Sequence, residues 1–151
     1  MERIKSFEAD HTKIVPGVYI SRTDGDIVSY DVRLKKPNAD DYLSYGAIHT
    51  IEHLFATYMR NCEIKDRVIY VGPMGCRTGF YLLIRNSDHK ETIDVIKNCF
   101  AFISDFEGEI PGNTEKECGN YKEHDLIAAK KEAKKFADAL KNVSETTIYY
   151  K

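Results

Sequence analysis

Three side chains that could bind a metal ion and move protons stand close together in the sequence: His49, Glu52 and His53. On an α-helix each residue advances by about 100°, so the two histidines lie about 40° apart and Glu52 lies about 60° to the other side of His49. All three would therefore share one face of a helix. Two imidazoles at this spacing can hold a divalent metal beside a proton-transferring carboxylate, as in metallopeptidases with the same His-x-x-Glu-His pattern. The pattern also fits polar groups that are hydrogen-bonded inside a core, so it needs support from elsewhere in the chain.

A catalytic metal site commonly has three protein ligands and one position left open for water or substrate. Cys118 is the best candidate for the third ligand, because a thiolate binds metals strongly and this cysteine lies in a polar loop just before a predicted helix. His11, His89 and His124 remain alternatives, since spacing in the sequence excludes none of them.

A second notable cysteine, Cys76, lies in the stretch 72–79, which is rich in glycine and also holds a proline. This composition predicts a tight loop between two strands, with the thiol exposed. An exposed thiol near a metal could act in catalysis, and a structural role fits the sequence equally well. Cys99 lies on the apolar side of a predicted helix and is expected to be a core thiol, with Cys62 structural by default.

Residue composition and hydrophobic periodicity predict the elements that must position these groups. Strands are expected at about 14–21, 28–34, 67–71 and 80–85, and helices at about 46–61, 89–106 and 123–142. Asp88 and Glu91 form a capping box for the second helix. The strand at 28–34 is predicted to bury one face, which leaves Arg33 on the opposite face and exposed by default. Hairpin-like strand pairs with helices between them predict an α+β fold, an antiparallel β-sheet packed with helices, in a single domain spanning 1–151.

The composition is that of an ordinary soluble protein, with 42% hydrophobic and 30% charged residues. The net charge of −2, without a basic block, gives no support for binding to nucleic acid or to a membrane surface. No apolar run approaches the roughly 20 residues of a membrane span, and the first residues lack the apolar core of a signal peptide. We therefore expect a cytoplasmic protein whose cysteines are buried, metal-bound or catalytic rather than paired in disulfides.

Five motifs stand in order along nearly the whole chain: SFEADH at 6–11, YDVR at 30–33 with PN at 37–38, IHTIEHL at 48–54, GPMGCRTGF at 72–80, and ECG at 117–119 with HDL at 124–126. In this combination the chain resembles the LuxS family of S-ribosylhomocysteine lyases. Five separated motifs are far more specific than His-x-x-Glu-His alone. Arg77 stands where the family often has glutamine, and Gly72 where a serine is familiar. Neither difference removes a chemical group that the family's mechanism needs.

The resemblance implies a homodimer with two active sites at the subunit interface. It implies one metal ion per subunit, with Fe(II) as the native ion and Zn(II) or Co(II) able to substitute. The implied ligands are His49, His53 and Cys118.

The resemblance also implies roles for five further residues. Cys76 and Glu52 would transfer protons. Ser6, His11 and Arg33 would line the substrate pocket, reaching in from the partner subunit.

The implied reaction cleaves the thioether of S-ribosylhomocysteine to homocysteine and 4,5-dihydroxy-2,3-pentanedione, the precursor of a quorum-sensing autoinducer, and so serves methyl-cycle salvage. The carbonyl of the opened ribose migrates from C1 to C2 and then to C3, and β-elimination releases the thiol. Such a sequence needs one Lewis acid and two proton carriers, with no organic redox cofactor.

Two other functions compete with this interpretation. A metallopeptidase would use Glu52 to activate a metal-bound water, but it would leave the Cys76 loop without a role. A structural metal domain would need a fourth protein ligand and no open position.

Overall fold

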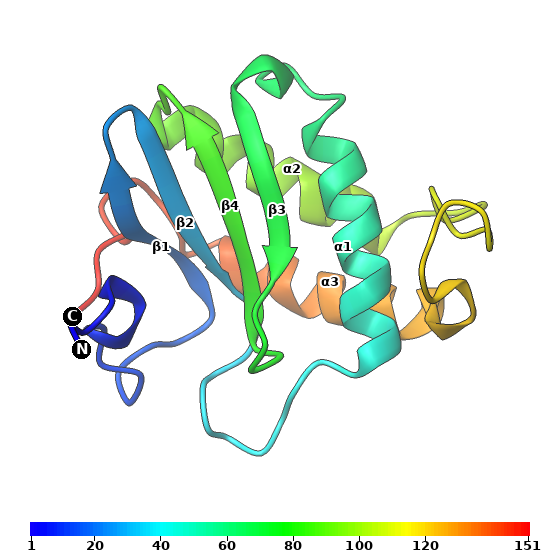
Figure 1. The fold of residues 1–151 in the computed structure, drawn as a ribbon, viewed down its shortest axis with the longest axis horizontal. Helices are drawn as coiled ribbons and strands as arrows, with labels where there is room; N and C mark the ends of the chain where they lie inside the picture. Colours follow the sequence, from blue (N-terminus) through cyan, green and yellow to red (C-terminus); the bar gives the residue numbers. More distant parts are fainter.

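A computed structural model describes residues 1–151 and shows an α+β fold with one four-stranded antiparallel sheet and three α-helices (Figure 1). The strand order across the sheet is β1-β2-β4-β3. The predicted fold class is confirmed, and so is each predicted helix and strand, with ends that differ by a few residues. None of the helices combines the length and the apolar character that crossing a lipid bilayer requires. The elements are β1 (Gly17–Asp24), β2 (Ile27–Arg33), α1 (Tyr45–Met59), β3 (Val68–Pro73), β4 (Gly79–Arg85), α2 (His89–Ser104) and α3 (Leu126–Leu140).

The predicted hairpin around Cys76 is present. β3 and β4 pair antiparallel, and the turn between them is closed by backbone hydrogen bonds from Met74 N to Gly79 O (2.9 Å) and from Arg77 N to Met74 O (3.0 Å). Cys76 lies in this turn and is exposed, as the composition of the loop predicts. The turn therefore presents the thiol at one end of the sheet.

β2 is buried on both faces, which corrects the prediction of a single buried face. Tyr30 and Val32 face the core and are fully buried, while Asp31 and Arg33 on the opposite face are only 0% and 2% exposed. The strand lies between β1 and β4, and the C-terminal Tyr150 covers its outer face and donates a hydrogen bond to Asp31 Oδ2 (2.6 Å). The default expectation of an exposed Arg33 is wrong, because alternation shows which residues share a face but not what covers that face.

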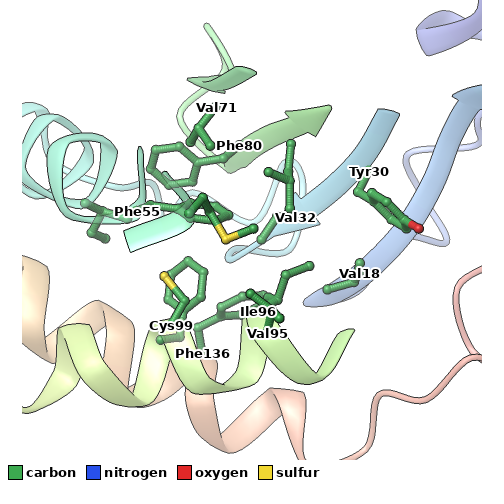
Figure 2. Packing of buried hydrophobic residues seen from close by; sticks show 14 of the residues in the cluster. Val18, Tyr30, Val32, Phe55, Val71, Phe80, Val95, Ile96, Cys99 and Phe136 are labelled. Atoms are coloured by element: carbon green, nitrogen blue, oxygen red, sulfur yellow. The ribbon is translucent and has the colours of Figure 1, made fainter. Parts of the chain in front are cut away.

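The hydrophobic core lies between the sheet and the helices, as Figure 2 shows. Phe100 of α2 sits at its centre, with ring centroids 5.1 Å from Phe55 of α1 and 4.8 Å from Phe136 of α3. Phe80 of β4 approaches Phe55 from the sheet side. Cys99 is fully buried here, and burial raises the pKa of its thiol, so the prediction of a core thiol is confirmed. These contacts hold α1 firmly against the sheet.

Side-chain caps set the starts of the helices. Asp88 accepts a hydrogen bond from Glu91 N (2.9 Å), so α2 starts where the capping box predicts, although the Glu91 carboxylate accepts from Arg67 instead of closing the box. Asp125 accepts from Ala128 N (3.0 Å), so α3 starts three residues later than the predicted position 123. The residues 121–123 form a separate short 3-10 helix. The chain just before α3 is therefore not part of the helix and can approach α1.

Phe100→Ala is expected to lower the free energy of unfolding by about 3–5 kcal/mol, because the fully buried ring joins the aromatic side chains of α1 and α3. Phe102 lies on the same helix but is 44% exposed, so Phe102→Ala is a matched control that should cost about 1 kcal/mol or less. Urea denaturation followed by circular dichroism measures both. Equal losses in the two variants would contradict this packing.

Candidate metal centre

Four side chains that can ligate a metal converge at one place: His49 and His53 of α1, and Cys118 and His124 from the connection between α2 and α3. Cys118 Sγ lies 3.4 Å from His49 Nε2, 3.9 Å from His53 Nε2 and 3.8 Å from His124 Nε2. Ligand atoms around one tetrahedral ion, at metal–nitrogen and metal–sulfur bonds of about 2.1 and 2.3 Å, are separated by about 3.6 Å. All four ligand atoms lie within 4.8 Å of one another, so they are close enough to share a single divalent ion.

The outer ring nitrogens of the two α1 histidines face oxygen atoms. His53 Nδ1 lies 2.8 Å from Pro111 O, and because a carbonyl oxygen can only accept, the proton of His53 sits on Nδ1. His49 Nδ1 is buried and makes no hydrogen bond of standard geometry, although Glu123 Oε2 lies 2.8 Å away. That carboxylate favours a proton on Nδ1. Both rings therefore present an unprotonated Nε2 to the metal position, as metal-binding histidines do.

The structure places His124, one of three alternatives that spacing leaves open, within the donor group. Its Nδ1 lies 3.1 Å from Thr50 Oγ1, which also accepts the backbone N–H of Asp125 at 2.9 Å. Burial, with a further contribution from His49 and His53, lowers the pKa of His124 to about 4. The ring is thus neutral at pH 7, which is the form that binds metals.

A glycine lets the segment that carries His124 approach α1. A Cβ atom at Gly46 would lie 2.7 Å from Asp125 Cβ and 2.8 Å from Glu123 O, both too close for van der Waals contact. His124 also stands directly before the residue that caps α3, which fixes its backbone. The short separation of six residues from Cys118 is the feature of the sequence that could have favoured His124 over His11 and His89, since the close approach itself is invisible there.

Four other predicted site residues line a separate pocket of about 390 Å³: Ser6, His11, Arg33 and Cys76. All four come from the same chain. The structure therefore groups Cys76 with the three residues that the resemblance assigns to the substrate pocket.

The metal donors lie apart from this pocket, and none of them lines it. Figure 1 shows the N-terminal segment (blue) at one end of the longest axis and the loop leading to Cys118 (yellow to gold) at the other, beyond α1. The N-terminal segment, which carries Ser6 and His11, is thus far from the loop that leads to Cys118 in the same chain. Glu52 lies on α1 with the two histidines and is half-buried.

Fold and site together define a small α+β protein with a mixed nitrogen and sulfur metal centre whose ligands come from one helix and one distant loop. The chain matches the family described as S-Ribosylhomocysteinase (LuxS) over residues 4–147, and it belongs to this family. It is 47%, 45% and 42% identical to proteins named S-ribosylhomocysteine lyase from Borreliella afzelii, Phocaeicola vulgatus and Finegoldia magna. These alignments cover 99% of the chain and 99%, 98% and 99% of the respective relatives. The resemblance read from the motifs is confirmed.

Gly46→Val is expected to weaken Zn²⁺ binding by about tenfold or more, because the added side chain pushes the 123–125 segment away from α1. Gly119→Ala is the matched control, since a Cβ atom there meets nothing within 4 Å although the residue adjoins Cys118. Competition with a chromophoric chelator measures both affinities, with circular dichroism to verify folding. An unchanged affinity in folded Gly46→Val would show that this contact does not hold the donor group together.

Proposed function

We propose that the protein is a metal-dependent S-ribosylhomocysteine lyase, with residues 1–151 acting as one catalytic domain. The observation that carries the proposal is the donor group, in which the two histidines of the His-x-x-Glu-His helix lie together with the distant Cys118, in a chain that matches the LuxS family almost throughout. The products would be homocysteine and 4,5-dihydroxy-2,3-pentanedione. Autoinducer synthesis, methyl-cycle salvage and a cytoplasmic location stay predictions from the sequence.

In this proposal His49, His53 and Cys118 hold one Fe(II) ion per subunit, and Zn(II) or Co(II) can replace it. Imidazole and thiolate ligands suit all three metals, and the oriented rings of the donor group fit such an ion. When bound, the ion supplies a Lewis acid that polarises the substrate carbonyl and makes the neighbouring C–H acidic.

Two groups of the chain would move the protons. Cys76 Sγ, as a thiolate, takes a proton from the carbon beside the carbonyl and returns it to the former carbonyl carbon. The hydroxyl proton of that neighbouring carbon passes to the former carbonyl oxygen, so that the carbonyl shifts from C1 to C2 and, in a second round, to C3. The Glu52 carboxylate then removes the proton from C4. The electron pair left at C4 expels the homocysteine sulfur from C5, and the sulfur receives a proton from the Glu52 carboxyl group. The enol formed between C4 and C5 then tautomerises to the methyl ketone, which is 4,5-dihydroxy-2,3-pentanedione.

We further propose a homodimer in which the donor group and Glu52 of one subunit face the partner's pocket. The separation of the two groups within one chain supports this arrangement (Figure 1). Phe7 and Tyr42 line the pocket and are 62% and 38% exposed, and apolar side chains gathered in this way favour burial against a partner. Because Cys76 shares the pocket with Ser6, His11 and Arg33, it would enter the site from the same subunit as they do.

Mixing two inactive variants tests this arrangement. Cys118→Ser removes a metal ligand and Cys76→Ala removes the thiol of the pocket. A heterodimer of the two would contain one site with both defects and one intact site, so random mixing should restore about a quarter of wild-type activity. If both residues served the site of their own subunit, every site would carry a defect and no activity would return.

One observation favours a second candidate, a structural metal domain. His124 brings the number of protein donors to four, which is a complete tetrahedral set. A lyase needs an open coordination position on the metal for its substrate. In a lyase, His124 would therefore have to stay unbound to the metal. A structural domain would bind its metal equally well but would not turn over substrate. The peptidase alternative is not favoured, because it gives the Cys76 pocket no role.

The decisive assay is the release of homocysteine thiol from S-ribosylhomocysteine, which we expect in the metal-loaded protein and not after treatment with a chelator. Cys76→Ala and Glu52→Gln should each lower turnover by about 10²-fold or more while keeping the metal content, because each removes a proton carrier. Cys62→Ser is the matched thiol control and should stay active. Near-normal turnover in folded, metal-loaded Cys76→Ala and Glu52→Gln would refute the assignment, and cleavage of a peptide without thiol release would favour the peptidase.

A further inference from the structure

Thr78 connects the exposed Cys76 to a buried charge. Its Oγ1 lies 3.0 Å from Cys76 Sγ and 2.8 Å from Arg33 Nη1. Thr78 is only 2% exposed, although Cys76, two residues earlier, is exposed at the pocket. The Thr78 hydroxyl therefore lies between the exposed thiol of Cys76 and the buried guanidinium of Arg33.

The guanidinium fixes the direction of the Thr78 hydroxyl. Arg33 carries only hydrogen-bond donors, so Thr78 Oγ1 must accept from Nη1. The single hydroxyl hydrogen is left for the other neighbour, Cys76 Sγ. A thiolate can only accept, so a hydrogen bond donated by Thr78 stabilises the thiolate relative to the thiol.

Further hydrogen bonds fix the positions of both Thr78 and Arg33. The carbonyl oxygen of Thr78 accepts the backbone N–H groups of both Leu34 and Lys35 at 2.9 Å. Arg33 is held by both carboxylate oxygens of Asp31, with Nε 3.0 Å from Oδ1 and Nη2 2.6 Å from Oδ2. Burial acts to lower the pKa of Arg33, but the hydrogen bonds and charge of Asp31 outweigh it and the pKa is raised, so the guanidinium stays charged.

We propose that Thr78 is a positioning residue for Cys76: its hydroxyl, oriented by Arg33, donates to Cys76 Sγ, holds it as a thiolate and fixes its direction in the pocket. This inference rests on the proposed role of Cys76 in proton transfer. His11 and Tyr81 also line the pocket, but Arg33 and Cys76 are the two groups that hydrogen-bond to Thr78 Oγ1.

Alkylation of Cys76 by iodoacetamide tests the proposal, because only the thiolate reacts and the readout does not depend on turnover. The full-length, metal-loaded protein is used, and the modified peptide is followed by mass spectrometry so that the other three cysteines do not contribute. Thr78→Val removes the hydroxyl and keeps the shape, and Thr78→Ser keeps the hydroxyl. Loss of a hydrogen bond to a charged group should slow Cys76 alkylation at pH 7 by about tenfold or more in Thr78→Val, with Thr78→Ser within about twofold of wild type.

Thr78→Val leaves Arg33 Nη1 without an acceptor and can fail to fold for that reason. Thr78→Ala then takes its place, because the smaller side chain admits a water beside Nη1, and it should show the same slow alkylation. Both variants should lose turnover with an unchanged metal content. Wild-type alkylation rates in a folded Thr78→Val or Thr78→Ala variant would overturn the proposal, whatever happens to turnover. If wild-type protein released no thiol from S-ribosylhomocysteine, the proposed lyase would fail, while the alkylation rates would still decide whether Thr78 stabilises the thiolate.

Discussion

The site depends on one close approach, in which the chain before α3 packs against the first turns of α1. Gly46 leaves no side chain in the way, and Thr50 accepts the backbone N–H of Asp125. Asp125 in turn caps α3, so the residue that starts the last helix also fixes the backbone beside His124. Because the core aromatic residues hold α1 against the sheet, this contact brings a distant loop to a rigid helix face. Rigid placement matters here, since a metal tolerates little error in the positions of its ligands.

A second constraint shapes the pocket. Burying Asp31 and Arg33 would be costly if either were unpaired, and the fold offsets that cost with nearly complete hydrogen bonding. Asp31 accepts from Arg33 through both oxygens and also from Tyr150, while the remaining arginine nitrogen donates to Thr78. Tyr150 therefore helps to hold Asp31, the carboxylate that fixes Arg33 at the pocket, while Ser6 and His11 of the N-terminal segment also line that pocket. The pocket therefore has the buried charge of Arg33 on one side and the exposed thiol of Cys76 on the other.

The metal donor group and the pocket that holds Cys76 are separate within one chain. The donor group and Glu52 belong to α1 and its neighbouring loop, whereas Cys76 belongs to the turn of a hairpin that shares its pocket with the N-terminal segment. A Lewis acid and a proton carrier act on one substrate only when both lie within bonding reach of it. The proposed homodimer would satisfy that requirement, and the exposed aromatic side chains beside the pocket fit such a contact.

The sequence by itself determined the elements and the local chemistry. The helix that carries His49 and His53, the Asp88 cap of α2, the hairpin that exposes Cys76 and the core position of Cys99 follow from local patterns of helix or strand periodicity and turn composition. Cys118 could be chosen as a ligand by its chemistry, and five ordered motifs identified the family. Only the tertiary structure decided that Arg33 is buried, that His124 joins the donor group and that Cys76 shares a pocket with Ser6 and His11. These three facts depend on which surfaces cover one another, through contacts between residues far apart in the chain, and periodicity carries no information about them. The His-x-x-Glu-His helix was visible from the start, but the partners that surround it are a property of the packed fold.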